Sequence, residues 1–153
     1  AIISTEVRML VDITKLAALT GIARATILAY LQYLHEAKLI RLLYSDDLSV
    51  KKMQKPDKIL MENTNLLQAL SLQVPNIGTM RETFFCNQLG YTHQVEYNKR
   101  GDYLIDHKYV FEIGGKAKDG KQVANIENAY IASDECDYPI GNKLPLWLFG
   151  LMY

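Results

Sequence analysis

The sequence predicts a mixed α/β fold of the α+β kind, with a helical N-terminal segment ahead of a small module of helices and strands. The first observation is the recurrence of apolar residues every three or four positions between Ala23 and Ala37, which is typical of a helix. The second is a series of short β-capable runs bounded by Gly, Pro, Asn or Asp. The third is a composition that is 49% hydrophobic and 22% charged, as in an ordinary globular chain.

The segment of residues 11–43 has the pattern of a helix-turn-helix. A short helix is expected over residues 15–19, and Gly21 supplies the tight turn to a second, longer helix. The apolar run 39–44 that follows is expected to be a strand. Helix, glycine turn, helix and strand in this order predict a winged helix-turn-helix domain over residues 1–52.

The remaining chain, residues 53–153, is expected to form a second, α/β domain. The polar stretch 51–57 contains a proline and is the expected link between the two domains. The pattern then predicts a strand, two helices, three strands, a short helix, a strand and a last helix, over residues 58–62, 66–70, 78–89, 94–97, 102–106, 109–113, 121–128, 129–132 and 145–151.

Charge and cysteine content narrow the class of protein. Residues 1–58 hold nine Lys and Arg against six Asp and Glu, whereas the rest holds eight against eleven, so the first part tolerates a polyanion better. Cys86 and Cys136 without a secretion signal fit a reducing compartment, and a cytoplasmic protein is expected. No apolar stretch reaches the roughly 20 residues of a membrane span, so no membrane partner is expected. Because the chain begins with Ala1 rather than Met, we expect upstream sequence.

Four motifs follow one another along the chain, and together they cover nearly all of it: Gly21–Ile40, Lys58–Leu67, Gly78–Phe85, and Gly101–Ile105 with Phe111–Ile113. In this order they resemble the domain of unknown function found C-terminal to many prokaryotic AAA-type ATPases of the AAA+ superfamily. The resemblance implies that the second domain is similar to a restriction-endonuclease-like fold. It also implies a missing N-terminal ATPase domain as a partner, and that domain would bind the ATP.

The resemblance also implies a site, because endonuclease-like folds usually pair an Asp on one strand with Glu-x-Lys on the next. Asp102 and Glu112 match the two carboxylates, but Gly114 stands at the lysine position. Two carboxylates on one face can hold a divalent metal such as Mg²⁺. Glu82, on the preceding helix, is a candidate third ligand, which makes Glu82, Asp102 and Glu112 the candidate metal set. Alternation carries the Glu112 face through Gly114 to Lys116 and Lys118, and Lys116 is the candidate displaced cation.

The loop between the two strands decides whether the carboxylates share a face. A two-residue loop would pair Asp106 with Tyr109 and would put Asp102 and Glu112 on opposite faces. A three-residue loop over residues 106–108 would place Asp102 directly across from Glu112. The sequence leaves both alternatives open.

Nucleic-acid binding is a separate possibility for the first domain. A recognition helix should present several basic and polar groups to DNA. The solvent side of the longer helix offers Arg24, apolar groups and Glu36, so a protein-facing helix is the favoured interpretation. Lys51, Lys52 and Lys55, next to the expected wing, are further candidate contacts that keep binding to DNA open.

These patterns favour a C-terminal, non-ATPase region of an AAA-type ATPase that acts as a protein- or nucleic-acid-interaction platform, with an inactive nuclease-like site. One alternative is a metal-dependent nuclease that uses Asp102, Glu112 and Lys116, and another is a winged-helix DNA-binding module. Residues 114–116 lack the spacing of a phosphate-binding loop, so no ATPase site is expected in this chain. No cofactor is expected either, apart from Mg²⁺ if the nuclease-like site is active.

Overall fold

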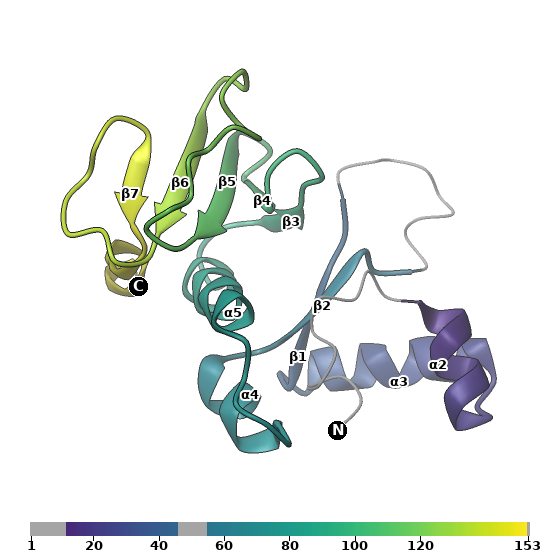
Figure 1. The fold of residues 1–153 in the computed structure, drawn as a ribbon. Helices are drawn as coiled ribbons and strands as arrows, with labels where there is room; N and C mark the ends of the chain where they lie inside the picture. The colour runs from purple at the N-terminus through teal and green to yellow at the C-terminus, as the bar shows by residue number, and fades with distance from the viewer. Residues whose placement is uncertain (1–11, 46–54, 153) are drawn as a thin grey trace. The chain divides into compact units, whose positions relative to one another are not determined.

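The chain forms two compact units, and each is described by itself (Figure 1). The structure is a computed structural model that describes residues 12–45 and 55–152. The units are Ala1–Pro75 and Asn76–Tyr153. This division comes later than the boundary expected after residue 52, because the strand that follows the linker pairs with a strand of the first unit.

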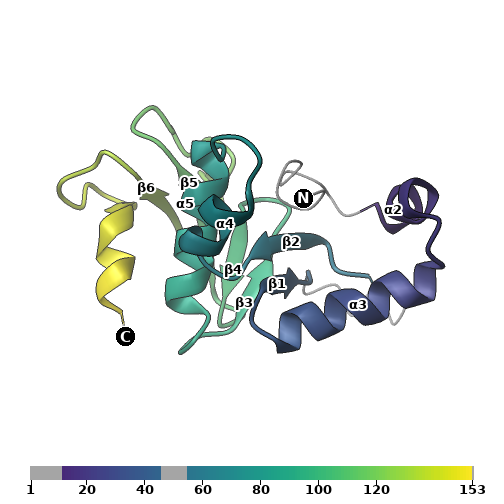
Figure 2. The same ribbon diagram turned by 90° about the horizontal axis from the view of Figure 1, so that it is seen from below.

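The first unit combines helices with a two-stranded antiparallel sheet. Its described elements are α2 (Ile13–Thr20), α3 (Arg24–Glu36), β1 (Ile40–Leu43), β2 (Lys58–Met61) and α4 (Thr64–Leu70). Helix α3 lies beside the sheet in both views (Figures 1 and 2). Its Ile27 and Leu31 are buried, as are Ile40, Leu43 and Leu60 of the strands. Apolar side chains at helical spacing therefore contribute to the core of this unit, as the sequence predicts.

Local signals account for the helix ends of this unit. The Asp12 carboxylate caps α2 by accepting hydrogen bonds from two backbone N–H groups of the first turn. Gly21 ends the helix in the left-handed region, with φ of 69°, and the chain then turns into α3. The Asn63 side chain caps α4 in the same way as Asp12 caps α2. The expected helix, glycine turn and longer helix are confirmed.

No single helix among the described residues is both long enough and apolar enough to cross a membrane. Helices α2 and α3 meet that test only when they are counted together, and the pair is bent by 105° at its break.

The described residues of the second unit build a five-stranded sheet in the order β3-β4-β5-β6-β7. The first three strands are antiparallel, whereas β6 and β7 join in parallel. The strands and the two flanking helices are α5 (Ile77–Leu89), β3 (Val95–Tyr97), β4 (Tyr103–Ile105), β5 (Tyr109–Gly114), β6 (Ala129–Ser133), β7 (Lys143–Pro145) and the 3₁₀ helix η1 (Leu146–Leu151).

An aromatic cluster covers one face of this sheet. Phe85 of α5 has its ring centroid 5.8 Å from that of Tyr103, 5.1 Å from that of Phe111 and 4.8 Å from that of Phe149 on η1. These separations are in the range where aromatic pairs add stability beyond the area they bury. Helix α5 and η1 are therefore held on the same face as Tyr103 and Phe111 (Figure 1).

The opposite face is covered by the connection between β5 and β6, and here one expectation is wrong. Residues 121–128 form consecutive turns instead of a helix. The Val123 N–H donates to the Gly120 carbonyl at 3.0 Å, and the Ile126 N–H donates to the Val123 carbonyl at 3.1 Å. Turns of this kind place residues three apart on one side, so that Val123 and Ile126 both pack on the apolar cluster of Leu104, Val110, Ala129 and Ile131.

The C-terminal end also differs from the expected single helix. Residues 143–145 form β7, which the sequence pattern missed, and a 3₁₀ helix follows from Leu146. A strand of three residues carries too little periodicity to be recognised from sequence. It exists because β6 offers a parallel edge with which Lys143–Pro145 pairs.

Candidate functional site

The hairpin between β4 and β5 answers the open question about the length of its loop. The register pairs Tyr103 with Phe111 and Ile105 with Tyr109, so the loop has the three residues 106–108. The paired register ends at Tyr103, and Asp102 directly precedes it. Because side chains alternate along a strand, Glu112 is assigned to the face of Val110, whereas Asp102 lies outside the paired residues of β4. The three-residue alternative is the one observed.

Asp102 is engaged by the backbone of the neighbouring strand. Its Oδ2 accepts a hydrogen bond from the Ile113 N–H at 2.6 Å. Its own N–H donates to the Phe111 carbonyl at 2.8 Å. Asp102 therefore contacts β5 on both sides of Glu112 and fastens the start of β4 to that strand.

Glu112 is buried, with a side chain that is 2% exposed. Its Oε1 lies 2.9 Å from the Nζ of Lys118, whose side chain is 34% exposed. Its Oε2 is also buried and accepts no hydrogen bond from the described residues. One oxygen of this carboxylate is thus paired with an ammonium group, and the other is buried without a hydrogen bond from the described residues.

Lys118, not Lys116, supplies this cation. Strand β5 ends at Gly114, and the Lys118 N–H then donates to the Gly115 carbonyl at 3.0 Å, which closes a turn. That turn directs Lys118 back over the strand, whereas the side chain of Lys116 is exposed. The sequence interpretation extended strand alternation past Gly114, where the chain has already left the sheet.

Glu82 does not complete a metal site with the other two carboxylates. Among residues 12–45 and 55–152, no group of three or more His, Cys, Asp or Glu side chains is placed to hold a metal ion. Glu82 belongs to α5, on the face of the aromatic cluster. Burial raises the pKa of the Tyr103 hydroxyl well above its ordinary value, and the nearby groups of Cys86, Glu82 and Asp102 raise it further.

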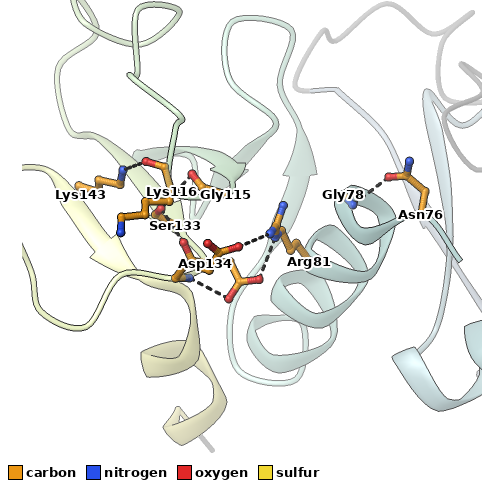
Figure 3. A network of polar contacts seen from close by, with 9 residues as sticks. Asn76, Gly78, Arg81, Gly115, Lys116, Ser133, Asp134 and Lys143 are labelled. Carbon is orange, nitrogen blue, oxygen red and sulfur yellow. Dashed lines mark hydrogen bonds and ion pairs between the residues drawn. The ribbon is translucent and has the colours of Figure 1, made fainter.

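A polar network lies at the carboxyl ends of β5 and β6 (Figure 3). Arg81 of α5 donates through Nε to the Asp134 carboxylate at 3.0 Å, and its guanidinium lies 3.6 Å from Glu135. The Ser133 hydroxyl donates to the Gly115 carbonyl at 3.1 Å. Sequence reasoning missed this network, because Arg81 and Asp134 are far apart in sequence and no local pattern joins them.

Lys143 of β7 extends the network to the connection that carries Lys118. Its Nζ donates to the Lys116 carbonyl at 2.7 Å (Figure 3). The same Nζ donates to the Lys118 carbonyl at 3.3 Å. The backbone on both sides of the turn is therefore held by the sheet. Apart from these contacts, Asn76 caps α5 by accepting a hydrogen bond from the Gly78 N–H (Figure 3).

The candidate nucleic-acid contacts are not assembled into a basic surface by the described residues. Arg24 is exposed at the first position of α3, and it is the only Lys or Arg of that helix. Lys55 is half-buried, and Lys51 and Lys52 lie outside the described residues. Exposed side chains along α3 include the aromatic rings of Tyr30 and Tyr33.

The site thus consists of the Glu112–Lys118 pair on β5 and the connection that follows it, with Asp102 bonded to the β5 backbone beside it. Both carboxylates have protein partners, a backbone N–H for Asp102 and an ammonium for Glu112. A comparison of the chain with models of known protein families, with curated proteins and with solved structures found no match.

Proposed function

We propose that this chain is the C-terminal, non-ATPase region of an AAA-type ATPase and serves as an interaction platform. Its second unit is an endonuclease-like module that does not cleave nucleic acid. Support for such a module comes from Asp102 and Glu112, of which the first directly precedes β4 and the second lies within the neighbouring strand β5. Support for a winged helix in the first unit comes from two helices joined at Gly21 and followed by an antiparallel strand pair.

The observation that carries the loss of activity is the engagement of both carboxylates within the protein. A metal-dependent nuclease needs carboxylate oxygens to bind its metal ion. Here Asp102 binds the Ile113 N–H and Glu112 pairs with Lys118. These contacts use the two charges to hold β4, β5 and the following connection together.

The helix α3 supports a protein partner for the first unit. Phosphate contacts require several Lys or Arg residues, and Arg24 stands alone in this helix. Tyr30 and Tyr33 are exposed on it, and tyrosine is enriched at the centres of protein–protein interfaces. We therefore propose that α3 binds protein, with the upstream ATPase region as the first partner to test.

The test measures binding between residues 1–153 and the polypeptide encoded upstream of them. We expect the upstream region to hydrolyse ATP, and we expect Tyr30→Ala with Tyr33→Ala to weaken its association with residues 1–153 at least tenfold in calorimetry. Gln32→Ala, on the same helix, is the matched control and should change the affinity little. An upstream region without nucleotide hydrolysis would refute the proposed parentage. A steep loss of DNA affinity between low and moderate salt would favour the DNA-binding alternative instead.

A metal-dependent nuclease is the second candidate, because Glu112 Oε2 is buried and accepts no hydrogen bond within residues 12–45 and 55–152. A divalent ion bound there would give that oxygen a partner. Incubation of plasmid DNA with Mg²⁺ or Mn²⁺ separates the two proposals. We expect no cleavage, and metal-dependent cleavage that Asp102→Ala abolishes would establish the nuclease.

A further inference from the structure

The space above Gly114 is already filled by another residue. A Cβ atom placed on Gly114 would lie 2.8 Å from the Cγ of Lys118 and 2.9 Å from both its Cβ and its Cδ. Carbon atoms pack at about 3.5–4.0 Å, so no side chain fits at position 114 while Lys118 keeps its place. The aliphatic part of Lys118 therefore crosses directly over Gly114.

The far end of the same side chain reaches the buried carboxylate. Lys118 Nζ lies 2.9 Å from Glu112 Oε1. Glu112 and Gly114 are two positions apart on β5, so alternation assigns them to one face of the sheet. The Lys118 backbone is fixed by the turn to Gly115 and by the contact of its carbonyl with Lys143. Its side chain thus follows the path that a lysine at position 114 would take toward Glu112.

We infer that Lys118 replaces, in space, the lysine that is missing at position 114, and that this position is glycine because the Lys118 side chain fills it. The role of Lys118 is that of a positioning residue, since it supplies the positive charge that a buried Glu112 requires. The inference rests on the proposed function only in treating position 114 as a former lysine position. The contacts among residues 112, 114 and 118 stand without it.

Moving the lysine from position 118 to position 114 tests this inference, and thermal unfolding is the measurement. Lys118→Ala leaves the Glu112 carboxylate buried without its cation, and Gly114→Lys collides with the Lys118 side chain. We expect each single change to lower Tm of the second unit by about 5–10 °C. The double variant Gly114→Lys with Lys118→Ala removes the collision and returns an amine to Glu112, so it should be more stable than either single variant. A double variant as unstable as the sum of the two would overturn the inference.

Gly114→Ala and Gly115→Ala are the matched pair of controls. Gly114→Ala should lower Tm when Lys118 is present and have little effect in the Lys118→Ala background. A Cβ at Gly115 would meet Arg81 instead, at 3.1 Å, so the effect of Gly115→Ala should be the same in both backgrounds. If the Tm changes of Gly114→Ala and Gly115→Ala depended equally on Lys118, the Lys118 side chain would not be crossing over Gly114 specifically.

The readouts keep the inference apart from the proposed function. Stability coupling between positions 114 and 118 is expected whether or not the chain cleaves DNA. If cleavage is found, the proposed loss of activity fails, and the inference then predicts that Lys118→Ala abolishes cleavage while Lys116→Ala preserves it. Cleavage that depends on Lys116 and not on Lys118 would show that Lys116, and not Lys118, supplies the amine.

Discussion

The two units each contain a buried glutamate with a cation beside it, but the pairs are built differently. Glu62 directly follows β2, and Arg41 of β1 reaches its Oε1 at 2.5 Å. Glu112 lies within β5, and its cation comes from Lys118 in an irregular connection. The Arg41 side chain is 11% exposed against 34% for Lys118. Both glutamates are almost fully buried.

The difference shows how firmly the surrounding fold fixes each charge. Arg41 pairs with Leu60 in the sheet register, and the Glu62 N–H donates to the Leu39 carbonyl at 3.0 Å. The first pair therefore follows from the register of two strands and cannot move without breaking it. The second pair depends on the course of a turn, so its lysine can be attached at another position. A buried charge is least replaceable where regular structure supplies its partner.

The largest expected effect is at Arg41. Arg41→Met leaves the Glu62 carboxylate buried without this cation, and losing one partner of a buried pair costs about 3–5 kcal/mol. Amide hydrogen exchange of β1 and β2 measures that loss within the first unit. The charge-free variant Arg41→Met with Glu62→Met should recover most of the stability, because apolar residues of similar volume often replace a buried pair well. A loss at Arg41 smaller than at Lys118 would reverse the comparison.

A smaller effect is expected for the carboxylate that binds backbone. Asp102→Ala removes the acceptor of the Ile113 N–H, and a hydrogen bond to a charged group contributes about 1.5–3 kcal/mol. Urea unfolding, together with amide hydrogen exchange in β4 and β5, measures this loss in the free energy of unfolding. Asp102→Asn keeps an acceptor oxygen, so its loss of stability should be less than half of the loss in Asp102→Ala. Equal losses for the two variants would mean that the hydrogen bond to Ile113 contributes little.

The smallest effect concerns the exposed end of the same hairpin. The pKa of Asp106 is held below its ordinary value of 3.8, first by the hydrogen bond from the Gln94 N–H and then by that from His93. A lowered pKa means that the folded state favours the charged form. The stabilisation is therefore present above pH 3.8 and is lost as the pH falls through the lower, folded-state value.

Carboxyl carbon shifts of Asp106 in an NMR titration measure this pKa directly. His93→Ala should raise it only in part, because the larger contribution from the Gln94 N–H remains. A return to the ordinary value in His93→Ala would show that the imidazole, and not the backbone, is the main cause. Asp106→Asn removes the titrating group and should flatten the change of stability with pH below 3.8.

Much of the fold was predictable because it depends on neighbours in sequence. The helix over residues 13–20, the turn at Gly21 and the helix over residues 24–36 follow from capping, a left-handed glycine and apolar spacing. Residues 121–128 were expected to form a helix but form turns. The three-residue spacing of Val123 and Ile126 brings both side chains to one side in a helix and in consecutive turns alike. Their hydrogen bonds are of the i to i+3 type, which the spacing of two apolar residues does not distinguish.

The candidate site was predictable in part for the same reason. Asp102 and Glu112 were identified from a motif, and the hairpin brings Asp102 into contact with the β5 backbone on both sides of Glu112. Strand alternation carried beyond Gly114 led to Lys116 and Lys118, and Lys116 was taken as the candidate cation. The contact of Lys118 with Glu112 depends on a turn that leaves the sheet, so no periodic pattern records it.

By itself, the sequence determined the order and type of most elements, the glycine turn between the first two helices and the two carboxylates of the hairpin. These features arise from interactions over a few residues, where spacing and side-chain chemistry suffice. Only the tertiary structure decided which lysine neutralises Glu112, that Arg81 binds Asp134, and that residues 143–145 add a strand to β6. Those contacts join distant parts of the chain, and they form only because the sheet brings their backbones together.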